Sequence, residues 1–326
     1  MNDVRYNIFK EKNMSSNLLP TERLPPSTGL ISILSSSCSR REKTVALFFK
    51  LCGFFSSPLK ERSQKRITAL LVGNKKLKDI QKISGIVFEG GSAKEKIKLE
   101  TSALQRVEVK DTTTLEAAMG LSNAVVLDIA NSINPGGAFM YSLWHGSQEE
   151  SICENTTLYS RLRHAKDLSQ SSQFIKEREC LMFPDVEVIY KNKTKEFIAN
   201  EAERPKLDVV ATAAIDFRRS SERRKFAEGK KENGKYQLNQ AGKALTQQKM
   251  RAVLTACQQS NKKNIVLGAM GCGAFLNRPE DIAECWKEVI GEFPQDSFDK
   301  VIFAITANSP KDQHNLKTFQ DKFSTL

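Results

Sequence analysis

Histidine is scarce in this sequence, and its cysteines follow no metal-binding pattern. The 326 residues include three histidines and seven cysteines, and no two cysteines form a Cys-X-X-Cys pair. An odd number of scattered cysteines argues against a disulfide framework and favours a reduced, intracellular setting. With so few histidines, a multi-histidine metal site or a Ser-His-Asp triad is poorly supported. The sequence therefore predicts no metal.

Two nucleotide-binding signatures and a membrane-spanning run are also missing. No glycine-rich stretch ends in Gly-Lys-Ser/Thr, and none reads Gly-X-Gly-X-X-Gly. ATP hydrolysis and NAD-dependent redox chemistry are therefore disfavoured, and no cofactor is expected. The longest apolar candidate, residues 45–55, is too short to cross a bilayer and is interrupted by Lys50.

The charge is strongly basic, with a formal net charge of +12. Such an excess favours anionic partners without choosing among nucleotides, nucleic acid and acidic membranes. No basic-aromatic motif accompanies it, so nucleic acid is not expected as a partner. Residues 23–66 hold nine Lys or Arg and two acids. This tract predicts either a helical extension packed on the main domain or a targeting segment for a membrane surface or mitochondrion.

The remaining chain alternates between strand-like and helix-like segments. Residues 1–90 are interpreted as a basic, partly helical extension, with helices over 40–84 broken at Pro58 and Gly73, and residues 91–326 as the main domain. A polar segment, residues 218–240, is expected to be an exposed loop. Strands are predicted at 104–109, 124–127, 186–190, 195–199, 207–213, 265–267 and 301–305, and helices at 113–121, 149–162, 250–257 and 282–290. This alternation is typical of a three-layer α/β domain.

A glycine-containing turn is followed closely by two adjacent acids. The run 131–137 (Asn-Ser-Ile-Asn-Pro-Gly-Gly) follows the strand at 124–127, and Gln148-Glu149-Glu150 comes soon after. Glycine lets a backbone approach a ligand and its N–H groups cradle phosphate, while a carboxylate beside it can do acid–base work. A second glycine loop, 268–273, follows the strand at 265–267. Because ligands bind beyond the carboxyl ends of strands in open α/β sheets, both loops are expected to meet at one crevice and hold a diphosphate.

These motifs together are similar to the macrodomain of poly(ADP-ribose) glycohydrolases of the microbial type. The similarity lies in 126–131, 134–137, 148–150 and 266–275, supported by 110–118, 156–159, Asn277 and Pro279, and it extends over residues 104–306 in the family's order. The resemblance implies a three-layer macrodomain with a mixed central sheet, here with an N-terminal helical extension. It also implies hydrolysis of the bond between the terminal ribose C1″ of ADP-ribose and its attached group.

The resemblance assigns roles to individual residues. Glu150 would be the catalytic carboxylate, and Glu149 would orient the distal ribose hydroxyls. The implied ligand-binding residues are Asp111, Asp128, Asn131, Gly136, Gly137, Ala138, Gln148, Gly271, Cys272, Gly273, Ala274 and Phe275. Among them, 136–138 and 271–273 would enclose the diphosphate, Asn131 and Phe275 would flank the ribose, Asp111 would lie near the adenine amine, and Gln148 would brace the loop. Without the resemblance, Glu149 and Glu150 could simply favour the helix dipole, Asp111 could be a helix N-cap, and Cys272 could be a packing residue.

Two departures from the family pattern bear on the substrate. Ala138 takes the place of a third glycine, and residues 139–147 form a longer spacer that includes Tyr141, Trp144 and His145. This bulk favours removal of mono-ADP-ribose from modified proteins, arginine-linked ADP-ribose being one option. Cleavage of poly(ADP-ribose) and a non-catalytic ADP-ribose-binding module are the alternatives. The expected partners are ADP-ribose and an ADP-ribosylated protein. The protein is expected to be a monomer. It is expected to act in the cytoplasm or, as a bacterial effector, inside a host cell.

Overall fold

The computed structural model describes residues 57–79, 86–91, 94, 98–140, 146–169, 171–191 and 196–324. Most of the basic tract 23–66 lies outside these ranges, and so do Tyr141, Trp144 and His145 of the spacer. The expected targeting or membrane role of the tract, and the expected effect of the bulky spacer on the substrate, therefore stay predictions. Within the described residues, none of the helices combines the length and apolar character needed to cross a membrane.

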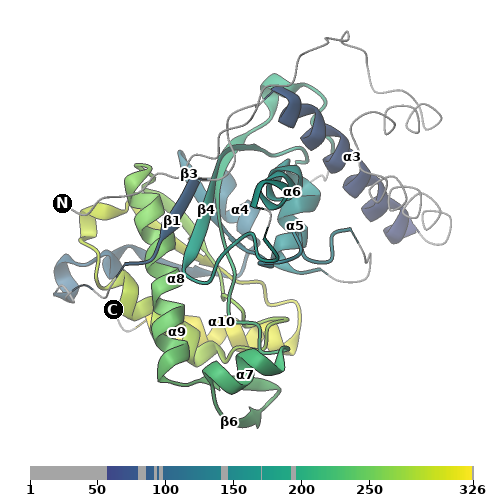
Figure 1. Ribbon diagram of the computed structural model, residues 1–326. Helices are drawn as coiled ribbons and strands as arrows, with labels where there is room; N and C mark the ends of the chain where they lie inside the picture. Colours follow the sequence, from purple (N-terminus) through teal and green to yellow (C-terminus); the bar gives the residue numbers. More distant parts are fainter. Residues whose placement is uncertain are drawn as a thin grey trace.

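A seven-stranded sheet forms the centre of the molecule (Figure 1). Its strand order is β1 (Ile86–Glu89), β4 (Glu179–Glu187), β5 (Lys206–Thr212), β3 (Ala124–Ile129), β8 (Asn264–Leu267), β9 (Lys300–Ala304) and β2 (Val107–Lys110). The five strands from β5 to β2 run parallel, whereas β4 is antiparallel to both of its neighbours. The predicted three-layer α/β fold with a mixed central sheet is therefore confirmed.

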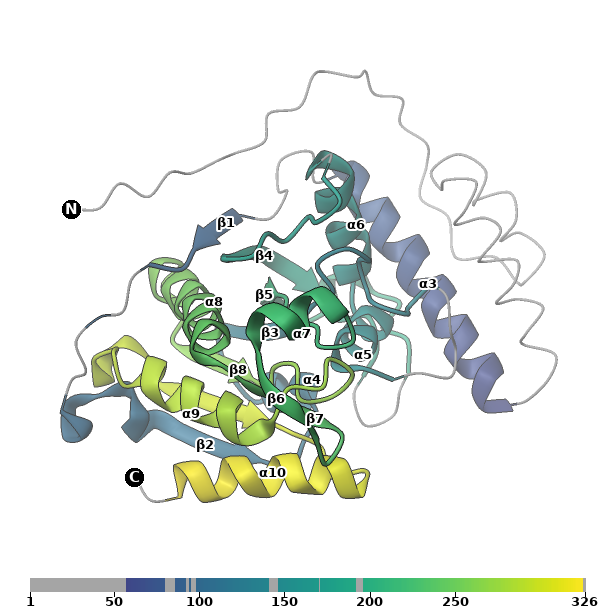
Figure 2. The same ribbon diagram turned by 60° about the horizontal axis from the view of Figure 1, so that its bottom comes forward.

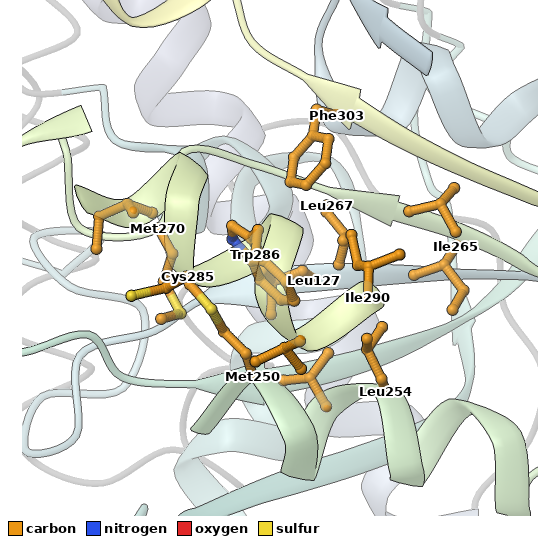
Figure 3. Packing of buried hydrophobic residues seen from close by; sticks show 14 of the residues in the cluster. Leu127, Met250, Leu254, Ile265, Leu267, Met270, Cys285, Trp286, Ile290 and Phe303 are labelled. Atoms are coloured by element: carbon orange, nitrogen blue, oxygen red, sulfur yellow. The ribbon is translucent and has the colours of Figure 1, made fainter. Parts of the chain in front are cut away.

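Three helices cover one face of the sheet (Figure 2). They are α8 (Gln240–Gln259), α9 (Pro279–Ile290) and α10 (Pro310–Phe323). Trp286 of α9 is fully buried among residues of the strands and of α8 (Figure 3). Its ring lies 5.9 Å from that of Phe303 on β9, centroid to centroid. Burial of each such side chain contributes about 1.5–3 kcal/mol, so this cluster anchors the helices that approach the ends of β8 and β9.

The opposite face is covered by α3 (Ser57–Asp79), α4 (Thr114–Met119), α5 (Gln148–Asn155) and α6 (Leu158–Ser169). A smaller unit, α7 (Ser220–Phe226) with the hairpin of β6 (Ala227–Glu232) and β7 (Lys235–Leu238), lies beside the sheet rather than in it. Short 3-10 helices complete the described elements: Leu99–Thr101, Ala103–Arg106, Glu201–Glu203 and Gln295–Ser297.

Four sequence predictions of local structure are wrong. The strand predicted at 104–109 begins only at Val107, because residues 103–106 form a 3-10 helix. The helix α3 continues through Gly73. Glycine occurs there for packing, because a Cβ would lie 2.4 Å from Ser160 Oγ and would prevent the close contact of α3 with α6. The helix predicted over 149–162 is two helices, since Thr156 adopts extended backbone geometry and its hydroxyl accepts a hydrogen bond from Leu158 N. The segment 218–240 is not a loop, because it forms α7 and the β6–β7 hairpin.

Buried Arg66 joins α3 to the rest of the fold. Its Nε donates to Glu154 Oε1 at 2.7 Å, and its Nη1 donates to Phe139 O at 2.5 Å and Ala138 O at 3.3 Å. Arg62 also donates to Glu154, at 2.6 Å. Helix α3 therefore contacts both α5 and the first glycine loop. The boundary predicted at residue 90/91 stays a prediction, although α3 and β1 pack within the same sandwich.

Arg66→Met is expected to lower the free energy of unfolding by about 3 kcal/mol, because it leaves the buried Glu154 carboxylate with one arginine fewer. Urea unfolding measures the change. The control is Arg163→Met, which removes an exposed pair with Asp167 and should cost less than about 0.5 kcal/mol. Equal losses in the two variants would contradict a special role for Arg66.

Candidate functional site

The two glycine loops meet at one edge of the sheet. Strands β3 and β8 are parallel neighbours, with Val126 paired to Val266, so the loops that follow them begin side by side. The first loop comprises residues 130–138 and the second loop residues 268–275. Together with the first turn of α5 and the start of α10 they enclose a cleft of about 960 Å³. Of the predicted site residues, those that line the cleft are Asn131, Gly137, Ala138, Gln148, Glu149, Glu150, Gly271, Gly273, Ala274 and Phe275.

Glu149 is held by backbone donors of the first loop. Its side chain is buried, and its two oxygens accept hydrogen bonds from Asn131 N at 3.0 Å and Gly136 N at 2.9 Å. The Asn131 side chain turns back into its own loop, where Oδ1 accepts from the N–H groups of Ile133 and Asn134. The loop is thereby shaped around the carboxylate.

Glu150 is fixed in a similar way. Its Oε1 accepts from Ala138 N at 3.1 Å, and its Oε2 accepts from Ser147 N at 3.3 Å. The Ser147 hydroxyl accepts from Glu150 N in return, which completes a capping box at the start of α5. Both acids thus also lie where the helix dipole favours negative charge, so the simpler helix-dipole interpretation and the site interpretation describe the same geometry.

The first loop requires glycine where the chain passes the two acids. Gly136 and Gly137 have φ values of 72° and 58°, in the left-handed region. A Cβ on Gly137 would lie 3.0 Å from Glu149 Oε2 and 3.5 Å from Glu150 Oε1. Ala138 is not among the residues with positive φ, which explains why an alanine is accommodated at the third position.

Gln148 connects α5 to β3. Its Oε1 accepts from Ile129 N at 2.9 Å, and its Nε2 donates to Leu127 O and to Thr114 Oγ1. These contacts attach Gln148, which directly precedes the two acids, to the end of β3. The register of α5 against the sheet therefore fixes where both carboxylates lie.

A third buried acid, Asp128, lies close to Glu149. Its side chain is fully buried on β3, and neither oxygen has a hydrogen-bond partner among the described residues. Burial raises the pKa of Asp128 to about 8. Burial, and next the proximity of Asp128, also raise the pKa of Glu149 well above its ordinary value, against the lowering effect of the two backbone N–H groups. The charge of Glu150 also raises the pKa of Glu149 and is the least of these causes.

The second loop faces the acids across the cleft. Gly271 has φ of 76°, and a Cβ there would meet Asn277 Nδ2 at 2.5 Å and Ala214 Cβ at 2.6 Å. Phe275 lines the cleft, and the Arg218 guanidinium lies over its ring at 4.7 Å from the centroid. The Cys272 side chain is buried, and burial raises the pKa of its thiol, which disfavours the reactive thiolate.

Four predicted residues do not line the cleft: Asp111, Asp128, Gly136 and Cys272. Asp111 is exposed, and its Oδ1 accepts from Ala307 N at 2.9 Å. The alternative of Asp111 as the helix N-cap is wrong, because Thr113 caps α4 through a capping box with Glu116. The assigned ligand roles of all four stay predictions.

Sequence reasoning missed several residues that line the cleft: Thr112, Thr113, Thr114, Ala304, Ile305, Thr306, Asn308, Asp312 and Asn315. Some of these follow β2 or end β9, so the rule that located the glycine loops could have found them. Asp312 and Asn315 lie within α10 and not at the end of a strand, so the same rule could not have found them. In the part of the chain that the structure describes, no group of three or more His, Cys, Asp or Glu side chains is arranged to hold a metal ion.

Comparison with known proteins supports the resemblance. Residues 63–197 match the family model "Microbial-type PARG, catalytic domain", where PARG is poly(ADP-ribose) glycohydrolase. A comparison with curated proteins finds no match. The sequence-based recognition of a microbial PARG-like domain is confirmed, and the matched segment begins inside α3.

Solved bacterial structures share the fold. PARG from Deinococcus radiodurans in complex with ADP-ribose is 23% identical, with a TM-score of 0.52 over 68% of this chain and 89% of that chain. PARG from Thermomonospora curvata bound to the inhibitor ADP-HPD is 22% identical, with a TM-score of 0.52 over 68% and 80%. A further T. curvata structure is 18% identical and covers 86% of this chain and 98% of its own, at a TM-score of 0.52.

Asp128→Asn is expected to change how stability depends on pH. A pKa raised from 3.8 to about 8 means that the folded protein keeps a proton that the unfolded chain loses, so this carboxyl makes stability fall as the pH rises from about 4 to about 8. The slope is at most about 1.4 kcal/mol per pH unit. An amide has no proton to lose, so the stability of the variant relative to wild type should increase with pH.

Urea unfolding at pH 5.5, 7 and 8 checks this expectation. Asp167→Asn serves as the control, because it removes an exposed aspartate. A stability difference between Asp128→Asn and wild type that stays constant across this pH range would show that Asp128 does not retain its proton in the folded protein.

Proposed function

We propose that this chain is a PARG-type glycohydrolase that cleaves the C1″ glycosidic bond of ADP-ribose and releases ADP-ribose. The observation that carries the proposal is the pair of buried acids, Glu149 and Glu150, each held by first-loop N–H groups at the mouth of a cleft whose far wall is the second loop. The matched family and the fold of its bacterial relatives support it.

The reaction follows from carboxyl chemistry. A protonated carboxyl gives its proton to the departing oxygen as the C1″–O bond breaks and positive charge develops on the sugar. The same group, now a carboxylate, takes a proton from water as the water oxygen bonds to C1″. The motif assigns this role to Glu150, while Glu149 remains beside it with a pKa above its ordinary value. Anchoring of the diphosphate by the loops would position the sugar against the acids.

Poly(ADP-ribose) is the first proposed substrate, because the matched family carries that activity in its name. Protein-linked mono-ADP-ribose, including arginine-linked ADP-ribose, is the second. The observation in its favour is Ala138, which lines the cleft at a position where the family pattern has glycine. The alternative that is not an enzyme is a non-catalytic ADP-ribose-binding module. An ADP-ribosylated protein remains the proposed partner.

Glu150→Gln is expected to lower the release of free ADP-ribose by about 100-fold or more, because the amide cannot transfer a proton. Chromatography of the released nucleotide gives the rate, and calorimetry gives the affinity for ADP-ribose, which should change little. Undiminished release in the variant would remove Glu150 from the mechanism. Wild-type protein that binds ADP-ribose and releases none would favour the binding module.

A panel of substrates separates the two substrate classes. Polymer and serine-, glutamate- and arginine-linked ADP-ribose are compared at equal concentration by kcat/KM, with Glu150→Gln as the blank for each. We expect the polymer to give the highest value. A higher kcat/KM on one protein-linked form would instead favour the mono-ADP-ribosyl substrate and identify its acceptor residue.

A further inference from the structure

The β6–β7 hairpin contacts the second loop. Tyr236 N donates to Leu276 O at 2.9 Å, and Arg278 N donates to Tyr236 O at 3.1 Å, which aligns β7 with the end of the loop. Next to Tyr236, the Lys235 ammonium donates to Cys272 O and lies 3.4 Å from Gly273 O. One cation therefore contacts two successive carbonyl oxygens of the second loop.

The geometry of the peptide bond gives this contact a consequence for the cleft. The described chain has no cis peptide bond, so each C=O points opposite to the N–H of the next residue. With the carbonyls of Cys272 and Gly273 directed to Lys235, the N–H groups of Gly273 and Ala274 are directed away from it. Both of these residues line the cleft.

The two loops differ in whether their N–H groups are occupied. In the first loop, the N–H groups of Gly136 and Ala138 donate to the two acids, and that of Gly137 donates to Asn134 O. In the second loop, no backbone hydrogen bond from Gly273 or Ala274 is made to any residue that the structure describes. The second loop is thus the one with N–H groups available to an anionic ligand.

We propose that Lys235 is a positioning residue that fixes the two peptide planes of the second loop so that the N–H groups of Gly273 and Ala274 bind the diphosphate of the ligand. This inference rests on the proposed function, because ADP-ribose supplies the diphosphate. Preformed donors need no reorganisation when the anion arrives, so the contribution appears in binding rather than in the chemical step.

The test compares three variants of the full chain with wild type. Lys235→Met removes the donor, Lys235→Arg keeps a charged donor, and Lys231→Met removes an exposed lysine of the same hairpin. Calorimetry gives Kd for ADP-ribose, ADP and adenosine, and steady-state assays on the preferred substrate of the panel separate KM from kcat. Thermal unfolding of each variant reports loss of structure.

Lys235→Met is expected to raise Kd for ADP-ribose and ADP, and KM, by about 10-fold, with kcat within about 2-fold of wild type, because two hydrogen bonds to a charged group lose their alignment. Adenosine affinity should be unchanged, since adenosine lacks the diphosphate. Lys235→Arg should recover most of the loss, and Lys231→Met should match wild type.

Unchanged Kd and KM in Lys235→Met, or equal losses for ADP and adenosine, would overturn the inference. Failure of the proposed function gives a different pattern, in which wild-type protein binds ADP-ribose and releases none from any substrate. The Lys235 comparison is then still decided by the binding measurements. Wild-type protein that binds neither ADP-ribose nor ADP would overturn both.

Discussion

The site depends on one interaction, the donation of backbone N–H groups from a glycine turn to two buried carboxylates. Acids as enclosed as Glu149 and Glu150 would be costly to bury without hydrogen-bond partners. The first loop donates three backbone N–H groups to these acids, from Asn131, Gly136 and Ala138, and Ser147, the N-cap of α5, donates a fourth. The loop and the acids therefore stabilise each other.

The two glycine loops share a second feature, a cation that contacts their carbonyl oxygens from outside the cleft. Arg66 donates to Ala138 and Phe139, and Lys235 does so to Cys272 and Gly273. The cations come from segments far apart in the sequence, α3 and β7. Turns made flexible by glycine are thus held by side chains that the glycine motifs do not reveal.

The sequence predicted the features that repeat or carry a strong local signal. The parallel strands, the loops at their ends and the pair of acids could be found from alternation and from the motifs. The continuous helix through Gly73 could not, because the contact with Ser160 that favours glycine is tertiary. The β6–β7 hairpin was missed since its polar residues have no alternating apolar pattern, and its order comes from backbone bonds to Leu276 and Arg278. Asn315 lines the cleft from α10, and no sequence motif indicated that position.

The place of β1 bears on how the molecule can be divided for experiments. Strand β1 pairs with residues 179–182 of β4, and it lies before residue 91. A fragment starting at 91 would leave the nine-residue β4 with one row of peptide groups open to other chains, besides lacking Arg66. Such an unprotected sheet border invites intermolecular pairing, so the missing strand alone would favour aggregation of that fragment.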